Sequence, residues 1–169
     1  VLYFEKPPLQ FWLTALGVKL FGVQAGTARL IPLGLASAVS LGASVLLARR
    51  LGARRPVWAA FMEATSILGF FCAQALTLDA LFSAWIVLAL TCAVEAVTAR
   101  VQERPHRAWT LGAFVAMSLA FLTKGLAAPV LLGGILLLSL PVAWSDPKVR
   151  SAVLRTTFDP LGWIVFVGI

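Results

Sequence analysis

Charged residues are scarce in this sequence, and cysteine and histidine are scarcer still. Charged side chains make up 12% of the 169 residues, whereas an ordinary soluble domain carries about a quarter. The two cysteines, Cys72 and Cys92, lack the spacing of metal ligands. This composition argues against a soluble domain and against a metal site built on cysteine.

A disulfide between the two cysteines is also not expected. Cys92 lies thirteen residues beyond Asp79, which on a helix is about 20 Å of rise. Cys72 falls near the end of the preceding apolar run, on the side of Asp79. Because a disulfide needs Cα atoms within about 7 Å, we predict that the two cysteines are not bonded to each other.

The net charge of +7 does not form a surface for nucleic acid. A nucleic-acid-binding domain needs a continuous basic face, whereas here basic connections alternate with apolar runs, as the positive-inside rule describes. No glycine-rich nucleotide loop is present either. Ten of the fourteen basic residues lie in three short connections: Arg49, Arg50, Arg54 and Arg55; Arg100, Arg104 and Arg107; Lys148, Arg150 and Arg155. We therefore expect a lipid bilayer and no nucleic acid as the partner.

What the sequence does contain is apolar runs of near membrane length. Hydrophobic residues make up 60% of the chain, and the mean hydropathy is +0.93. Uncharged runs cover residues 30–48, 64–78, 80–94, 108–123 and 125–145, and another begins near Leu161. A spanning helix needs about 20 residues, so 64–78 and 80–94 require extension by Val57–Glu63 and Glu95–Ala99. We predict an all-α, polytopic transmembrane helical bundle with five complete spans and part of a sixth.

The predicted spans place all three basic connections, together with His106, on the cytoplasmic side. The opposite side receives Val1–Phe21, the turn Gln74–Asp79 and the turn at Lys124–Gly125. Leu9–Phe21 is too short to span, and its aromatic residues suit the headgroup region. We expect a helix there that lies in the outer interface, within an outer juxtamembrane segment over residues 1–26.

Two further features are expected to be structural. Gly34, Ala38 and Gly42 recur every four residues and would let a neighbouring helix approach closely. Glu63 and Glu95 fall near the cytoplasmic ends of their helices, where they can pair with arginines of the adjacent loops or reach water. Neither feature points to an activity.

Two ionisable residues on the outer side have both a structural and a functional interpretation. Asp79 begins a helix, where a carboxylate favours the positive end of the dipole, but its surroundings are otherwise apolar. Lys124 interrupts an apolar run, and snorkelling explains its charge. Gly125 after it would let backbone or ligand approach closely, which snorkelling does not require. Both residues are therefore candidates for a site.

The sharpest local motif is Glu5-Lys6-Pro7-Pro8. Proline pushes Lys6 towards extended backbone, so a charged pair is held on a stiff segment above the predicted interfacial helix. A lysine suits phosphate as a point charge, and an exposed ion pair is the alternative explanation. Together with Asp79 and Lys124, this motif suits recognition of a lipid-linked phosphate by a site that also holds an acid/base or orienting group.

These motifs resemble those of a known family. The similar segments are Tyr3-Phe-Glu-Lys-Pro-Pro-Leu-Gln-Phe-Trp-Leu, Phe21-Gly-Val, Ala28-Arg-Leu-Ile-Pro, Leu76-Thr-Leu-Asp-Ala-Leu and Leu122-Thr-Lys-Gly-Leu. In this order they resemble the bacterial aminoarabinose transferases that modify lipid A. Those enzymes belong to the protein-O-mannosyltransferase-like superfamily of polyprenyl-phosphate-dependent, C-type-fold glycosyltransferases. The resemblance covers most of the chain and is specific for the family, but not for one sugar or acceptor.

The resemblance implies an inner-membrane glycosyltransferase whose site faces the periplasm and which inverts a sugar carried on undecaprenyl phosphate. By this resemblance Lys6 contacts the carrier phosphate, and Glu5 lies beside it, near a divalent metal ion if one is used. Asp79 is then a catalytic carboxylate of the cavity, and Lys124 binds substrate there. The sugar, aminoarabinose-like or a hexose, and the acceptor, lipid A or another glycan or protein, stay open.

The resemblance also places the family's principal catalytic aspartate before Val1. We therefore expect residues 1–169 to be a fragment of a single transmembrane glycosyltransferase domain, inactive alone. The missing parts would be an N-terminal span, the start of the catalytic loop and a C-terminal region.

Two other functions are compatible with the residues. A transporter or flippase of polyprenyl-linked substrates would also gather charge near lipid phosphates, but transporters typically place ionisable groups near the midplane on broken helices. Pro32 and Pro129 could break helices, yet neither has an ionisable residue beside it at depth. A non-catalytic scaffold would leave the Glu5–Pro8 motif without a purpose.

Overall fold

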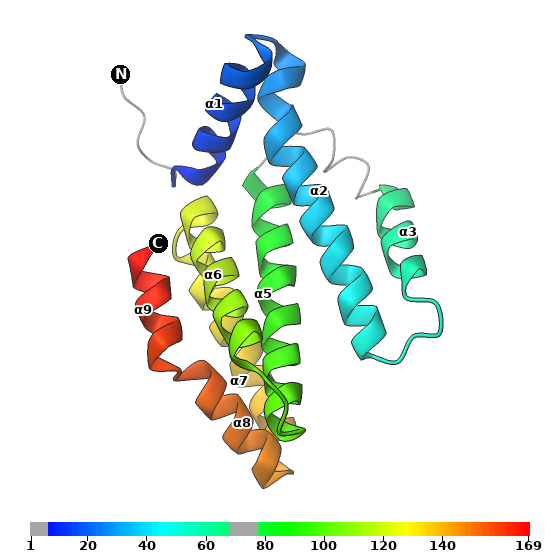
Figure 1. The fold of residues 1–169 in the computed structure, drawn as a ribbon, viewed down its shortest axis with the longest axis vertical. Coiled ribbons are helices and arrows are strands. Elements are labelled where there is room, and N and C mark those ends of the chain that lie inside the picture. The colour runs from blue at the N-terminus through cyan, green and yellow to red at the C-terminus, as the bar shows by residue number, and fades with distance from the viewer. Residues whose placement is uncertain (1–6, 68–77) are drawn as a thin grey trace.

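The computed structural model describes residues 7–67 and 78–169, which fold into helices joined by short connections (Figure 1). The helices are α1 Leu9–Phe21, α2 Ala25–Arg50, α3 Val57–Thr65, α5 Leu78–Val101, α6 Arg107–Lys124, α7 Ala127–Trp144, α8 Pro147–Thr157 and α9 Pro160–Gly168. No strand occurs in the two described ranges. The prediction of an all-α fold is confirmed.

The junction between α1 and α2 is a tight turn with a fixed geometry. Gly22 ends α1 with a φ of 88°, which favours glycine, and its N–H donates to the carbonyl of Val18 at 2.9 Å. The Thr27 hydroxyl then donates to the Gly22 carbonyl at 2.6 Å and accepts from the Gln24 N–H at 3.2 Å. These bonds satisfy backbone groups at the end of α1 and at the start of α2. The bounds of α1 are those that the sequence predicts.

The third basic connection contains a helix, α8, that the hydropathy pattern did not indicate. Its first turn is capped by the Asp146 carboxylate, which accepts from the Lys148 N–H at 2.8 Å. Asp159 caps α9 in the same way, accepting from the Gly162 N–H at 3.0 Å. Each capping aspartate is followed by a proline, which suits the first helical position because its missing N–H costs nothing there.

The structure contains a helix at most of the predicted membrane spans, but the helices differ in length. By length and composition, α2 and α5 are the described helices able to cross a membrane, with 26 and 24 residues. α6 and α7 have 18 residues each and lie where spans were predicted. α9 begins at Pro160, beside the predicted start of the last span.

The predicted span over 64–78 is interrupted. α3 ends at Thr65, and Ser66 has extended backbone with φ −68° and ψ 143°. Both hydroxyls bond to carbonyls of the last turn, Thr65 to Phe61 at 2.7 Å and Ser66 to Glu63 at 2.8 Å. Such bonds compete with continuation of the helix. Residues 68–77 lie outside the described part of the chain.

The three basic connections gather towards one end of the molecule, and α1 lies at the other (Figure 1). This agrees with the prediction that the three basic connections lie on one side of the membrane and that residues 1–21 lie on the other. Apolar residues of five helices meet near the α1 end: Leu9, Ala36, Leu81, Ala84, Trp85, Ile86, Ala120 and Ala128. Four of these are alanines, which let helix backbones approach closely. The cluster holds α1 against α2 and α6.

The predicted small-residue packing stripe on α2 is not used by any described neighbour. Gly34, Ala38 and Gly42 are exposed, and no described atom lies within 4 Å of a Cβ built on either glycine. α2 packs through Ala36 and Ala43, which are 4% and 1% exposed. Among the described helices the stripe is therefore not the packing face of α2, because a helix that is apolar on all sides offers several faces to its neighbours.

Candidate functional site

Asp79 and Lys124, both predicted as site residues, form an ion pair between the carboxylate Oδ1 and the ammonium Nζ. Asp79 is the second residue of α5, and Lys124 is the last residue of α6. These helices run antiparallel side by side, so the start of one lies beside the end of the other (Figure 1). The α5–α6 pairing therefore joins two residues that are 45 positions apart.

The pair is open to a ligand. The side chains of Asp79 and Lys124 are 66% and 43% exposed, and an exposed ion pair contributes at most about 1 kcal/mol. Each charge also suits the dipole of its own helix end. Lys124 Nζ lies 5.4 Å from the centre of the Phe82 ring, within the range of a cation–π contact. The ammonium is thus positioned by two weak contacts, and Asp79 is its one hydrogen-bond partner within residues 7–67 and 78–169.

Gly125 connects this pair to the proline motif. It ends α6 with a φ of 64°, which favours glycine, and its N–H donates to the Phe121 carbonyl at 2.7 Å. A Cβ built on Gly125 would lie 3.7 Å from Cγ of Pro7. The described end of the Glu-Lys-Pro-Pro motif therefore lies against the residue that follows Lys124, as the predicted cluster requires.

Glu5 and Lys6, which precede Pro7 in the chain, lie outside the described residues. Their assigned contacts with a carrier phosphate, and with a metal ion in the case of Glu5, stay predictions. Within residues 7–67 and 78–169, no three His, Cys, Asp or Glu side chains gather in a way that could hold a metal ion. Cys92 is buried and free, while Cys72 is outside the described part.

Two buried polar groups on α1 and α5, the helices that border the site, were not predicted. Gln10 is 7% exposed and Trp85 is 6% exposed. Neither Gln10 Oε1 nor Trp85 Nε1 has a hydrogen-bond partner among the described residues. Leaving such a group unpaired costs about 1–3 kcal/mol, so both are candidates for contact with water or a ligand. The signal for Gln10 is a single amide within the otherwise apolar start of α1.

Glu63 and Glu95, which were predicted to pair with arginines of the adjacent loops or to reach water, have different kinds of partner. Glu95, 8% exposed, accepts from Nε of Arg50 at 2.6 Å and from a second nitrogen of the same guanidinium. Glu63 accepts from the hydroxyls of Ser40 and Ser44 and not from an arginine. These serines are one turn apart on α2, so both hydroxyls point at α3 and meet the carboxylate directly.

Comparison with known proteins places the chain among lipid-dependent glycosyltransferases. Residues 5–166 match the family described as dolichyl-phosphate-mannose-protein mannosyltransferase. The chain is 34% identical to the undecaprenyl phosphate-alpha-4-amino-4-deoxy-L-arabinose arabinosyl transferase of Pseudomonas savastanoi pv. phaseolicola, covering 99% of this chain and 30% of that relative. It is 36% identical to the second such enzyme of Pseudomonas fluorescens, over 78% of this chain and 23% of the relative.

The structure also resembles two crystal structures of ArnT from Cupriavidus metallidurans. The apo structure matches with a TM-score of 0.79 and 28% identity, covering 98% of this chain and 30% of that one. The structure bound to undecaprenyl phosphate matches with a TM-score of 0.80 and 29% identity, covering 99% and 30%. The chain thus spans about 30% of the length of these relatives.

Proposed function

The chain belongs to the dolichyl-phosphate-mannose-protein mannosyltransferase family, and on this basis we propose that its protein is an integral membrane glycosyltransferase. It moves a sugar from a polyprenyl-phosphate carrier to an acceptor. The observation that carries the proposal is the Asp79–Lys124 pair with Pro7 beside Gly125. The similar ArnT structure bound to undecaprenyl phosphate supports the class of carrier.

In the proposed reaction an acceptor oxygen attacks the anomeric carbon of the sugar. The bond from that carbon to the carrier phosphate breaks, and polyprenyl phosphate leaves with the bonding electrons. Lys124, and Lys6 next to Pro7, bind the phosphate and stabilise the negative charge that it gains. The missing Cβ of Gly125 lets the proline motif approach closely at Pro7, next to the residue that binds the phosphate.

The role of Asp79 depends on the acceptor. A hydroxyl acceptor must lose a proton as it attacks, and the Asp79 carboxylate is the general base that we assign to it. A phosphate acceptor such as that of lipid A is already ionised, so Asp79 then acts by orienting the Lys124 ammonium through their ion pair. The names of the relatives favour 4-amino-4-deoxy-L-arabinose as the sugar, and we propose lipid A as its acceptor.

We place this site on the periplasmic face of the bacterial inner membrane. Its support is the distribution of basic residues, because the three basic connections gather at the other end of the molecule (Figure 1) and such connections favour the cytoplasm. Residues 1–26 are then an outer juxtamembrane segment. The whole chain is one part of a single transmembrane domain that continues in the longer protein.

The test uses the full-length protein in nanodiscs with a polyprenyl-phosphate-linked aminosugar and lipid A, followed by mass spectrometry of the product. We expect Lys124→Gln and Lys6→Ala to raise the KM for the carrier by about 10- to 150-fold, since a charge-assisted hydrogen bond contributes about 1.5–3 kcal/mol. Asp79→Asn should lower kcat. The matched controls are Lys19→Gln, an exposed lysine of α1, and Asp146→Asn, which keeps the α8 cap.

Full transfer activity in both Lys124→Gln and Asp79→Asn would refute the site. Movement of the intact lipid-linked sugar across the bilayer without cleavage would instead identify a transporter.

A further inference from the structure

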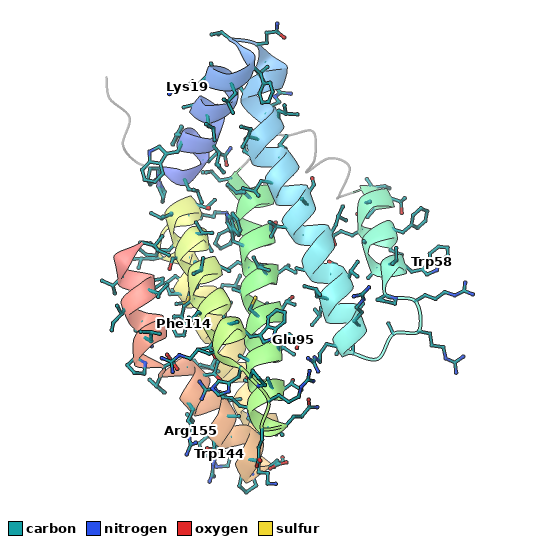
Figure 2. All side chains as sticks on the ribbon, in the orientation of Figure 1. Lys19, Trp58, Glu95, Phe114, Trp144 and Arg155 are labelled. Atoms are coloured by element: carbon teal, nitrogen blue, oxygen red, sulfur yellow. The ribbon has the colours of Figure 1, made fainter. Side chains whose placement is uncertain are left out.

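A basic cavity lies at the end of the molecule opposite the Asp79–Lys124 pair. Its volume is about 870 Å³, and it lies between the α5–α6 connection and α8. Five cationic residues from these segments line it: Arg100, Arg104, Arg107, Lys148 and Arg155. Figure 2 shows Arg155 near this end, together with Trp144. We propose that the cavity binds a phosphate-bearing anion, with the head group of an acidic phospholipid as the favoured source.

The positive charge around the cavity is only partly compensated. Among the described residues, Arg100 pairs with Asp159 at 3.3 Å, and its Nε is buried without a partner. Glu103 is the one acid that the described part of the chain contributes to the cavity wall. Even when Asp159 and Asp146, which accepts from the Lys148 N–H, are counted with Glu103, three acids face the five cations of the wall, so two positive charges are unbalanced. None of the other four cations has an ion pair within the described residues.

The backbone adds to the positive electrostatic potential of the cavity. α6 begins at Arg107, beside the cavity, and no side chain caps its first turn. Arg107, Ala108 and Trp109 line the cavity, and the N–H groups of a first helical turn have no carbonyl partner within the helix. Free N–H groups at the positive end of a helix dipole bind phosphate. The cavity thus offers backbone donors as well as cations to one anion.

Exposed apolar side chains at the ends of α7 and α8, outside the cavity wall itself, favour a lipid as the source of the phosphate. Leu154 and Phe158, at the end of α8, are 41% and 70% exposed. Trp144 is 58% exposed, and the Arg150 guanidinium lies 5.3 Å from the centre of its ring. Exposed tryptophan is typical of the membrane interface, and basic pockets between helices on the cytoplasmic side suit anionic head groups. Acyl chains would follow these apolar side chains.

The experiment compares two double variants of the full-length protein. Arg104→Gln/Arg107→Gln removes two cations of the cavity, and Arg54→Gln/Arg55→Gln removes two exposed cations of the α2–α3 connection. Binding of short-chain phosphatidylglycerol is measured by native mass spectrometry. Each basic residue near an anionic surface contributes about 1 kcal/mol, so we expect about 30-fold weaker binding in the cavity variant. The control should change less than about twofold.

Three probes separate the possible ligands: short-chain phosphatidylglycerol, short-chain phosphatidylcholine and inorganic phosphate. Tightest binding of phosphatidylglycerol assigns the site to a lipid head group, while equal binding of inorganic phosphate assigns it to a soluble phosphate. Equal weakening in both double variants would overturn the proposal, because it would show only diffuse attraction by the basic end. Failure of both anionic probes to bind would overturn it as well. Sugar transfer, measured on the same preparations, tests the proposed function separately.

Discussion

Replacing Gly17 by alanine is expected to weaken the packing of α1 on α2. A Cβ built on Gly17 collides with the backbone oxygen of Thr27 and lies 3.7 Å from Cγ1 of Ile31. A backbone carbonyl cannot rotate away as a side chain can, so the added methyl group must displace α1 itself. Overpacking of this kind costs about 1–3 kcal/mol.

Gly26 provides the matched control, because it lies at the same junction with no described atom within 4 Å of its Cβ position. Alanine favours a helix over glycine by up to about 1 kcal/mol, and both variants share this gain. The two should therefore differ by about 1–3 kcal/mol, with Gly17→Ala the less stable. This corresponds to an opening of α1 that is about 5- to 150-fold more frequent.

Hydrogen exchange of the full-length protein in nanodiscs measures this opening through peptides that cover α1. Equal protection in the two variants would contradict the reasoning, as would stronger protection in Gly17→Ala. Because α1 leads back to Pro7, which lies beside Gly125, we also expect Gly17→Ala to raise the KM for the lipid carrier. Gly26→Ala should leave that KM unchanged.

Three further predictions concern stability, each measured by thermal or denaturant unfolding of the full-length protein. Asp79→Asn should change the free energy of unfolding by less than about 1 kcal/mol, since its ion pair is exposed; a larger loss would mean that any effect on activity reflects unfolding. Gly162→Ala should destabilise by about 1–3 kcal/mol, because its Cβ would collide with an aromatic ring of α6. Gly133→Ala, which has open space, should be neutral or stabilising. Glu95→Gln should cost about 1–3 kcal/mol by weakening the charge-assisted hydrogen bonds to the partly buried guanidinium of Arg50, and an unchanged midpoint would show that the pair contributes nothing.

Local chemical signals account for the parts of the fold that could be predicted. Pro8 before α1 and Gly22 after it mark the bounds of that helix, and the structure has the same bounds. The Asp-Pro pairs at Asp146 and Asp159 are equally local, and they could have revealed α8. The break at Ser66 was not predictable from hydropathy, because the uncharged run over residues 64–78 reads like a continuous span. The break depends on hydrogen bonds from hydroxyl groups to backbone carbonyls.

The site, too, was predictable only in part from the sequence. The number of spans between Asp79 and Lys124 places both residues on one side of the bundle, but it does not decide which outer turns are neighbours. Their contact depends on α5 packing against α6 along their length. The position of Pro7 against Gly125 likewise depends on the apolar cluster that holds α1.

The sequence by itself determined that the chain is helical, that its surroundings are lipid, and that its basic connections share one end. These properties follow from composition and from the spacing of charges along the chain, which need no neighbours to be defined. Only the tertiary structure decided that Asp79 meets Lys124, that Glu63 binds Ser40 and Ser44, and that five cations surround one cavity. Helices that are apolar on nearly every face can pack in many ways. The choice among them depends on close contacts at small residues such as Gly17 and Gly162, which the apolar pattern along the chain does not distinguish.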